Sequence, residues 1–395
     1  MENRKTKIGI NASFIRKPNT GIGQVTLNVL REFSKREDLD FILYLEEDLP
    51  ADLFLPKNFK KRIFLPPWKR DDLIRKIWWE KYALPKAVKR DGCDVLLSMY
   101  QCPTLIEPYE EVQHIMIVHD IIPKFFPDYL DNIRKKFYWQ LTEKAIRKAD
   151  KLMTVSQHTE KDLIEQLKIH GKKITVSYID VDENYKKSIT PEHSARVLKK
   201  YKLKPGYILA GGGYEARKNV EGAVRAYKLL LERNTKLHFI AELPKLVIYG
   251  KIMPEKLSLA LDIRKLLREL DLTTHVKLLD LVPQKDLPTI FENASVFVYP
   301  SYYEGFGMPV LEAMNLGKPV ITSKTSSLPE VGGDGVLYCD PKDANDIAMV
   351  LKNVLENHEL RQALSTRARL QAQKFSWQKF CEKIIEISKQ INYND

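Results

Sequence analysis

The order of apolar and polar residues predicts buried strands alternating with amphipathic helices along almost the whole chain. Short apolar runs are typical of buried strands, and apolar positions three or four residues apart are typical of helices. Such an alternation favours parallel sheets covered by helices on both faces. The expected strands of the first half are Lys7–Asn11, Phe41–Leu45, Arg62–Leu65, Asp94–Ser98, His114–Val118, Lys151–Val155 and Ile174–Tyr178. Those of the second half are Tyr207–Ala210, Lys245–Tyr249, Val276–Leu279, Ser295–Tyr299, Pro319–Thr322 and Gly335–Tyr338.

Helices are expected between these strands and at the end of the chain. The clearest patterns are Gln24–Arg36, Asp71–Val88, Asp131–Ala149, Gln157–Leu167, Ala344–Glu356, Leu360–Lys374 and Ser376–Ile391. Ser156 fits the N-cap of the fourth helix, where its hydroxyl can accept a backbone hydrogen bond. The polar, lysine-rich stretch Asn184–Gly206 contains two prolines and is interpreted as a linker. The expected fold class is α/β, with two Rossmann-like doubly wound domains, 1–186 and 187–375, that bind ligand at the carboxyl ends of their strands.

Size and composition narrow the class of protein. The chain has 395 residues, enough for two domains, and its 44% hydrophobic and 29% charged residues are typical of a globular protein. No apolar run has the length of a membrane-spanning helix, and residues 1–7 lead into a strand without a secretory apolar region. The four cysteines lack CxxC spacing, which fits a reducing cytoplasm and predicts neither a disulfide nor a zinc site. They are Cys93, Cys102, Cys339 and Cys381.

The net charge of +12 is unevenly distributed. The segment from Lys57 to Arg90 holds twelve Lys or Arg against three Asp or Glu, together with Trp68, Trp78 and Trp79. One interpretation is a solvated helix face with its tryptophans in the core. The other is a surface that docks on anionic lipid headgroups, because these attract basic residues and tryptophan prefers the membrane interface. No DNA- or RNA-binding motif is present.

The strongest candidate for a ligand site is the stretch from Tyr299 to Met314. Its pattern is the end of a buried strand, a glycine-bearing loop and a helix in which Pro309 suits the first position. Backbone N–H groups at the helix start would face an anion. They belong to Phe306, Gly307 and Met308. Glu304 and Glu312 flank this end, and because carboxylates repel phosphate, we expect them to bind neutral hydroxyls beside it. A phosphate joined to many hydroxyls is a nucleotide sugar.

A second candidate follows the strand that ends at Ala210. The glycine run 211–213 allows a ligand to approach the backbone closely, and Arg217 with Lys218 supplies charge for a diphosphate. The alternative is an ordinary glycine turn with two surface cations. The phosphate-binding helix start expected at Pro309 favours the diphosphate interpretation.

Two weaker candidates lie in the first half. Gly21 and Gly23 follow the first strand without GxGxxG spacing, which disfavours a nicotinamide enzyme; they either contact a diphosphate or form a plain strand–helix turn. His119 ends a buried strand, where it is either a satisfied core side chain or a catalytic group. Asp120 either orients the imidazole or caps the following segment.

The sequence does not favour metal chemistry. Asp180 and Asp182 form a DxD pattern, which binds metal in some sugar transferases. Arg217, Lys218 and the helix dipole already supply the positive charge that such a metal would bring. The spacing of histidines and cysteines offers no zinc site, and no GxSxG elbow is present. We therefore expect no metal and no cofactor.

Taken together, these motifs resemble the retaining glycosyltransferases of family 4, which have the GT-B fold. The nearest similarity is to the mannosyltransferase-like branch of O-antigen, capsule and exopolysaccharide assembly. The segments that carry it are Gly21–Gly23, Val118–Asp120, Thr154–Ser156, Glu215–Asn219, Pro300–Glu312, Ser326–Val331, Trp79–Pro85 and Phe375–Trp377. The turn Tyr178–Asp182 departs from the Pro-Asn-Gly sequence that is common in the family.

The resemblance implies roles for the candidate residues. The catalytic group would be His119 beside the reacting sugar, Arg217 and Lys218 at the diphosphate, and Glu304 at hydroxyls of the donor sugar. Further donor contacts would come from Gly21, Gly23, Asp120, Val282, Phe306, Gly307, Met308 and Glu312. Among these, Glu312 would hold the ribose and Val282 would line the nucleobase. The last helix, within 376–395, would return to the first domain.

The implied activity is transfer of a hexose, preferably mannose, from a nucleoside diphosphate sugar to a hydroxyl of a glycan or lipid-linked glycan, with retention at the anomeric carbon. GDP-mannose is the favoured donor and a UDP sugar the alternative. The first half would bind the acceptor, and its basic segment would dock on the inner face of the plasma membrane. Three alternatives are open: a sugar-nucleotide epimerase of the same fold, a glycogen-phosphorylase-like enzyme, whose pyridoxal lysine has no supporting context here, and a non-catalytic nucleotide-sugar-binding partner.

Overall fold

The computed structural model describes residues 5–49, 55–64, 72–106, 111–237, 242–251 and 259–390, which form two compact units. The first unit extends to Ile179 and includes the chain again from Phe375; the second extends from Asp180 to Lys374. The sequence places these divisions at 186/187 and 375/376. The interpretation of 184–206 as a linker is wrong, because this stretch contains an 11-residue helix, α7 (Pro191–Tyr201), within the second unit. Thr190 caps that helix by accepting a hydrogen bond from the backbone N–H of His193.

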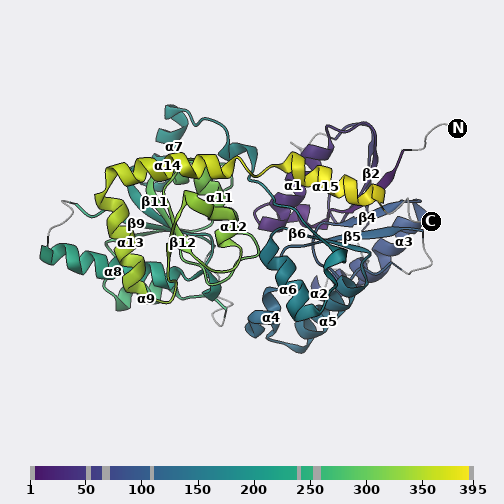
Figure 1. Cartoon of the computed structure of the whole chain (residues 1–395), viewed down its shortest axis with the longest axis horizontal. Coiled ribbons are helices and arrows are strands. Elements are labelled where there is room, and N and C mark those ends of the chain that lie inside the picture. Colours follow the sequence, from purple (N-terminus) through teal and green to yellow (C-terminus); the bar gives the residue numbers. More distant parts are fainter. Residues whose placement is uncertain are drawn as a thin grey trace. The chain divides into compact units, whose positions relative to one another are not determined.

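The first unit is built on a seven-stranded parallel sheet with the order β3-β2-β1-β4-β5-β6-β7. The strands are β1 (Lys7–Asn11), β2 (Asp40–Leu45), β3 (Phe59–Ile63), β4 (Val95–Ser98), β5 (Gln113–Val118), β6 (Lys151–Thr154) and β7 (Ile174–Val176). The helices are α1 (Gly21–Phe33), α2 (Asp72–Trp78), α3 (Leu84–Arg90), α4 (Ile122–Phe125), α5 (Ile133–Lys148), α6 (Gln157–Leu167) and α15 (Trp377–Gln390). Helices α1 and α15 lie together on one face of this sheet, and α2, α5 and α6 lie on the other (Figure 1).

The second unit repeats this architecture on a six-stranded parallel sheet with the order β10-β9-β8-β11-β12-β13. Its strands are β8 (Tyr207–Gly211), β9 (Leu246–Tyr249), β10 (Val276–Leu279), β11 (Ala294–Tyr299), β12 (Val320–Ser323) and β13 (Leu337–Cys339). Besides α7, its helices are α8 (Val220–Leu237), α9 (Ile263–Glu269), α10 (Leu287–Glu292), α11 (Met308–Asn315), α12 (Leu328–Gly332), α13 (Ala344–Glu356) and α14 (His358–Ala372). Helices α8, α9 and α13 cover one face of the sheet, and α7, α11 and α14 cover the other (Figure 1).

Each sheet has one point where the strand order changes direction, between β1 and β4 in the first unit and between β8 and β11 in the second. At such a switch point the two following connections leave toward opposite faces, so a crevice forms beyond the carboxyl ends of the strands. The loops after these four strands are therefore the expected place for a ligand in each unit. Arg217, Lys218, Glu304, Phe306 and Gly307 lie in these loops, whereas His119 and Asp120 follow β5 and Val282 follows β10.

The basic, tryptophan-containing segment differs from its prediction. Instead of one helix over 71–88, the chain forms α2, a π-helical segment, η2 (Trp79–Ala83), and α3. Trp79 is fully buried, stacks on Phe64 with 5.2 Å between ring centroids, and donates its indole N–H to the Phe64 carbonyl at 3.2 Å. Trp78 is half-buried against the same core, and Trp68 lies outside the described residues. The two described tryptophans therefore belong to the core and do not form a membrane-facing surface.

Four further findings concern the ends of two elements, the cysteines and the membrane. The third strand is Phe59–Ile63 rather than 62–65. Gly21 and Gly23 lie in the first turn of α1 rather than in the loop before it. The four cysteines are free thiols, all of them buried. Among the helices that the structure describes, none is both long and apolar enough to cross a bilayer.

Candidate active site

An ion pair between the loops after β8 and β11 lies at the centre of the candidate site. A guanidinium nitrogen of Arg217 is 2.8 Å from Oε1 of Glu304, and each side chain is only 11% exposed. The hydroxyls of Tyr299 and Ser301 donate to the same oxygen at 2.7 and 3.0 Å. Burial opposes ionisation, but the charges of Arg217 and Lys218 and the Tyr299 hydrogen bond hold the pKa of Glu304 below its ordinary value. The carboxylate is therefore ionised near neutral pH.

Backbone contacts join these two loops at the switch point. The N–H of Tyr302 donates to the carbonyl of Arg217 at 2.7 Å, and Arg217 Nη1 donates to the carbonyl of Tyr303 at 3.0 Å. The side-chain amide of Asn219 donates to the carbonyl of Pro300 at 3.0 Å. Because the contacts run in both directions, the guanidinium has a fixed orientation before any ligand binds.

Lys218 is the next residue of the same short turn and adds a second positive charge to that of Arg217. Its ammonium donates to the carbonyl of Gly212 and lies 3.3 Å from a carboxylate oxygen of Glu215. The three glycines at 211–213 all have positive φ angles, so the chain turns sharply here, and a Cβ on Gly211 would lie 2.1 Å from the carbonyl oxygen of Tyr249. Two cations thus face the carboxyl ends of β8 and β11.

The start of α11 forms the opposite side of the same switch point. The N-cap residue Gly307 has φ = 104° and no side chain caps the helix. Pro309 has no N–H and the N–H of Val310 donates to the carbonyl of Gly307 at 2.9 Å, so the N–H at the start of the helix that can face an anion is that of Met308. The positive φ favours glycine at 307, and a Cβ there would also lie 2.7 Å from Leu328 Cδ2. The hydroxyl of Ser327 donates to the carbonyls of Glu304 and Phe306 at 2.9 and 2.8 Å and holds the loop before the helix. This end of α11 keeps the properties of an anion site.

Glu312, which lies on α11, has an environment opposite to that of Glu304. Burial raises the pKa of Glu312 to about 7; the nearby hydroxyl of Tyr185 opposes this rise, and the charge of Asp182 adds to it. The two carboxylates that sequence reasoning placed at one site thus differ in protonation: Glu304 is ionised and Glu312 is close to half-protonated at neutral pH.

The DxD pattern has local structural partners. Asp180 pairs with the ammonium of Lys186 and accepts the N–H of Val181 at 2.8 Å. Asp182 accepts the N–H of Asn184 at 3.0 Å and caps a short 3-10 helix. Within the described ranges, no three or more His, Cys, Asp or Glu side chains are grouped so that they could hold a metal ion.

His119 follows β5 in the first unit and is buried. Its Nε2 lies 2.9 Å from the carbonyl oxygen of Met99, and since a carbonyl only accepts, Nε2 carries the proton. Burial lowers the pKa of the ring, which the Met99 contact and the charge of Asp120 oppose, so the ring is neutral and Nδ1 is an acceptor. The backbone of His119 donates to Gln101 Oε1 at 3.3 Å and accepts from the Thr159 hydroxyl at 3.1 Å. Asp120 accepts the backbone N–H of Ile122 at 3.0 Å. This contact corresponds to the second role considered for Asp120, capping of the segment that follows.

The glycine pair is in the same unit, where β1 leads into α1. Thr20 caps the helix by accepting the N–H of Gly23 at 3.2 Å. A Cβ on Gly23 would lie 2.2 Å from the carbonyl oxygen of Lys17, whereas one on Gly21 would meet nothing within 4 Å. Gly23 is thus required by packing alone. Val282, the predicted nucleobase contact, is buried after β10, two strands from β8 in the sheet order of the second unit.

Several residues that shape the site were given no role from the sequence. Tyr299 and Ser301 lie inside the highlighted stretch, but only the folded loop turns their hydroxyls onto Glu304. Tyr185 lies in the stretch interpreted as a linker, yet it reaches Glu312. A hydroxyl residue directly after a strand and close to a candidate carboxylate is the signal that identifies the first two.

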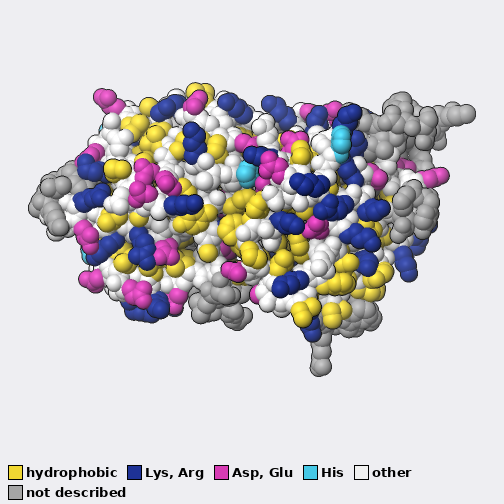
Figure 2. Space-filling model, turned by 60° about the horizontal axis from the view of Figure 1, so that its bottom comes forward, with side chains coloured by type: hydrophobic (Ala, Val, Ile, Leu, Met, Phe, Trp, Pro, Cys, Tyr) yellow, Lys and Arg dark blue, Asp and Glu magenta, His cyan; other side chains and the backbone are white. Residues whose placement is uncertain are grey.

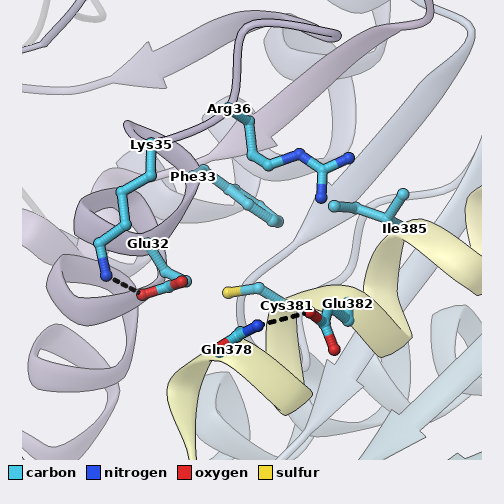
Figure 3. Close-up of a pocket in the computed structure, with 8 residues that line it drawn as sticks. All are labelled: Glu32, Phe33, Lys35, Arg36, Gln378, Cys381, Glu382 and Ile385. Carbon is cyan, nitrogen blue, oxygen red and sulfur yellow. Dashed lines mark hydrogen bonds and ion pairs between the residues drawn. The ribbon is translucent and has the colours of Figure 1, made fainter.

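A pocket in the first unit lies away from these residues, between α1 and α15 (Figure 3). Its lining residues are Glu32, Phe33, Lys35, Arg36, Gln378, Cys381, Glu382 and Ile385. The last four belong to α15, and the first four belong to the last turn of α1 and the turn after it, whereas Gly21 and Gly23 belong to the first turn of α1. At a rise of about 1.5 Å per residue, the two ends of this helix are about 18 Å apart. The pocket therefore does not belong to the carboxyl edge of the sheet.

Two doubly wound parallel sheets, each with candidate ligand-binding loops at its switch point, are the architecture of the GT-B class of glycosyltransferase fold. The comparison with solved structures agrees. WaaG, a glycosyltransferase involved in lipopolysaccharide biosynthesis, matches with a TM-score of 0.72 at 17% identity over 97% of this chain and 99% of its own. A glycosyltransferase from Rickettsia africae matches with a TM-score of 0.71 at 16% identity over both whole chains.

Sequence comparison then gives the family. Residues 19–184 match the model described as Glycosyltransferase Family 4, and residues 194–371 match that of Glycosyl transferases group 1. O-antigen chain mannosyltransferase B of Escherichia coli is 31% identical over 71% of each chain. O-antigen chain mannosyltransferase RfbU of Salmonella typhimurium is 24% identical over 87% of this chain and 90% of its own. The mannosyltransferase WbdA of Escherichia coli is 30% identical over 67% of this chain, but the match spans only 32% of WbdA. This chain belongs to glycosyltransferase family 4.

Proposed function

We propose that this glycosyltransferase moves a hexose, with mannose as the first candidate, from a nucleoside diphosphate sugar to a glycan hydroxyl in the assembly of a cell-surface polysaccharide. The observation that carries the proposal is the Arg217–Glu304 pair at the switch point, with Lys218 and the start of α11 beside it. The O-antigen mannosyltransferases among the relatives support mannose as the sugar and a glycan as the acceptor.

In this proposal the second unit binds the donor. Arg217, Lys218 and the N–H of Met308 at the start of α11 stabilise the negative charge that collects on the diphosphate as it leaves. The ionised Glu304 accepts hydrogen bonds from hexose hydroxyls, and Glu312 accepts those of the ribose. Because the cations are side chains, the reaction needs no metal ion to neutralise the leaving group. Val282 lines the base, and GDP-mannose is the first donor to test, with UDP sugars second.

The chemical step is a substitution with retention. The bond from the anomeric carbon to the diphosphate oxygen breaks and leaves its electron pair on the diphosphate. The acceptor oxygen forms its bond on the same face and gives its proton to the departing phosphate. A double displacement would require a carboxylate nucleophile. Glu304 instead has Oε1 bound to Arg217 and to two hydroxyls. In the first unit, the residues for which the family resemblance implies a role in transfer are His119, Asp120, Gly21 and Gly23.

Product analysis with a panel of sugar nucleotides tests the reaction. Thermal unfolding identifies the donor first, because a ligand at about 100 times its Kd adds about 2.7 kcal/mol of stability. With that donor and a saccharide acceptor, we expect a glycoside whose anomeric configuration by NMR equals that of the donor. A free epimerised sugar nucleotide would indicate the epimerase, and binding without turnover the non-catalytic partner. A trapped covalent sugar–enzyme adduct would overturn the single-step route.

We also propose that the first unit docks peripherally on an anionic membrane, through α4 and α5 rather than the tryptophans of 57–90. Ile133 is 84% exposed and Phe137, one turn later on α5, is 51% exposed. Arg134 and Lys136 alternate with them and are also exposed. Phe125 on α4 is a further exposed apolar residue. On the face of the molecule that Figure 2 shows, hydrophobic side chains lie among Lys and Arg side chains at the lower right. Apolar residues flanked by basic ones suit an interface with anionic headgroups.

Vesicle co-sedimentation tests this surface. We expect the wild-type chain to bind phosphatidylglycerol vesicles at low salt and to release them at high salt, since the attraction is screened. The double variant Ile133→Ser, Phe137→Ser should lose binding. Met349→Ser with Leu370→Ser is the matched control, because these side chains of the second unit are exposed to a similar degree. Absence of wild-type binding at low salt, or equal binding by both variants, would refute the proposal.

A further inference from the structure

A second buried carboxylate, Glu80, lies in the first unit and is not used by the proposed reaction. It is completely buried and lies on the π-helical segment η2 between α2 and α3. Tyr100 and Tyr138 both donate their hydroxyls to it, from the loop after β4 and from α5 respectively, the latter at 2.8 Å. π-Helical segments are uncommon and frequently occur at functional sites, because the extra residue re-aims a side chain. Here the π-helical segment carries Glu80, whose carboxyl group accepts the hydroxyl of Tyr100 from the loop after β4.

The counter-charge of Glu80 is enclosed with it. The ammonium of Lys76 lies 3.7 Å from Glu80 Oε1 and 4.7–5.2 Å from the centres of three aromatic rings. These rings belong to Phe14, Tyr100 and Tyr138. Phe14 comes from the loop after β1, and its ring contacts that of Tyr100 at 4.4 Å between centroids. The charge pair thus joins α2, α5 and the loops after β1 and β4.

Tyr100 connects this cluster to the predicted site residues of the same unit. Its hydroxyl is 2.8 Å from that of Ser13, in the loop that leads to Gly21 and Gly23. The residues on either side of Tyr100 hold His119: the carbonyl of Met99 accepts from the imidazole, and the side chain of Gln101 accepts the backbone N–H. Gln101 also donates to the carbonyl of Asp120 at 3.0 Å. Every one of these contacts is polar and directional.

We propose that Glu80 is a positioning residue for sugar transfer: through Tyr100 it fixes the loop after β4 and with it the orientation of the His119 imidazole. The inference rests on the proposed function, because it assigns Glu80 to that reaction. Glu80 touches neither donor nor acceptor in this account. Its carboxylate determines where Tyr100 lies, and the chain on both sides of Tyr100 determines where His119 lies.

Two tyrosines that donate to the same carboxylate give a matched test. Tyr100→Phe removes the hydroxyl that links Glu80 to the loop after β4, whereas Tyr138→Phe removes the equivalent hydroxyl from the α5 side. We expect Tyr100→Phe to lower kcat about tenfold with the donor KM unchanged, because small errors in placing a group beside the reacting atoms are costly. We expect Tyr138→Phe to leave kcat at the wild-type value. Urea unfolding should show similar losses of stability in the two variants.

A second readout does not depend on turnover. The ¹⁵N NMR signals of the His119 ring, assigned with a His119→Gln variant, report which nitrogen carries the proton and whether the contact with Met99 persists. These signals should move in Tyr100→Phe and stay in place in Tyr138→Phe. Equal effects of the two variants, or no effect of Tyr100→Phe on kcat and on these signals, would overturn the inference. If the wild-type chain makes no glycoside, the proposed function fails instead, and the NMR comparison still shows whether Glu80 orients His119.

Discussion

The two units contain buried carboxylates with nearly the same neighbours and pKa values that are shifted in opposite directions. Glu304 in the second unit accepts two hydroxyl hydrogen bonds and pairs with a cation, and so does Glu80 in the first. Nevertheless the pKa of Glu304 is lowered and that of Glu80 is raised. Hydroxyl donors therefore do not decide the charge of a buried glutamate in this protein.

The cations make the difference. Glu304 lies 2.8 Å from the guanidinium of Arg217 and also feels Lys218, so attraction outweighs burial. Glu80 is completely buried, which raises its pKa, and the ammonium of Lys76 that opposes this is 3.7 Å away. The negative charge of Glu46 raises the pKa of Glu80 further. A carboxylate that stays ionised and partly accessible suits the binding of hydroxyls. A carboxylate enclosed by two tyrosines suits the fixing of loops.

The largest effect is expected where the tight ion pair is broken. Glu304→Gln leaves the guanidinium of Arg217 buried without a charged partner, and loss of one member of a buried pair costs about 3–5 kcal/mol. We therefore expect the urea unfolding free energy of the second unit to fall by this amount. Transfer should fall by a hundredfold or more, on the order of 3 kcal/mol in the barrier, as for the loss of one preorganised donor.

A control within the same unit is Glu232→Gln. This exposed carboxylate pairs with Lys228 at 3.4 Å on α8, and surface pairs contribute about 0–1 kcal/mol. If Glu304→Gln and Glu232→Gln lowered stability equally, the contrast between the two buried carboxylates would have no energetic basis.

The pH dependence of the unfolding free energy of Glu80→Gln tests the contrast between Glu80 and Glu304. The raised pKa means that Glu80 stabilises the fold fully below its unfolded value of 4.5 and loses this contribution as pH rises through its folded pKa. Glutamine does not titrate, so Glu80→Gln should gain stability relative to wild type with rising pH, by at most about 1.4 kcal/mol per pH unit. For Glu304→Gln the sign is opposite, because a lowered pKa stabilises above 4.5 and is lost as pH falls. Urea unfolding of both variants from about pH 4 to about pH 8 compares the slopes; slopes of the same sign would contradict the assignment.

The second glutamate of the donor site gives a pH dependence of binding. Burial raises the pKa of Glu312 to about 7. If ribose hydroxyls donate to its ionised form, donor affinity is highest above pH 7 and falls below it, by at most about tenfold per pH unit. Tyr185→Phe removes a buried hydroxyl near Glu312 that lowers this pKa, so the midpoint should move to higher pH in calorimetric titrations with a nucleoside diphosphate.

Tyr227→Phe is the control for that titration. Tyr227 is a buried tyrosine of α8 whose hydroxyl donates to the Pro244 carbonyl at 3.1 Å. Its loss should leave the midpoint unchanged. A pH-independent donor affinity in the wild-type chain would show that Glu312 does not bind the donor as an anion.

Sequence periodicity was sufficient for the fold and for half of the site. Buried parallel strands such as Leu246–Tyr249 are continuous apolar runs, so hydrophobicity alone predicts their position to within about one residue. The Arg217–Glu304 pair was expected in one site because both residues follow adjacent switch-point strands. The Glu80 cluster was not found, since its members come from a π-helix, a loop and a distant helix, and no local pattern joins them. The α7 helix was missed because its polar sequence buries little beyond Val197.

The smallest effect is expected at Ser156, where a neutral cap supports the first unit's network from the other side of His119. The Ser156 hydroxyl accepts the N–H of Thr159 at 3.1 Å, and the Thr159 hydroxyl donates to the carbonyl of His119 at 3.1 Å. Ser156→Ala should cost about 1 kcal/mol of unfolding free energy in the first unit, the usual contribution of an N-cap. Ser156→Asp restores an acceptor and should recover most of it. The ¹⁵N signals of the His119 ring then distinguish two cases: if they stay in place in Ser156→Ala, the orientation of the imidazole depends on the Tyr100 side alone, and if they move, the neutral contacts share that role with Glu80.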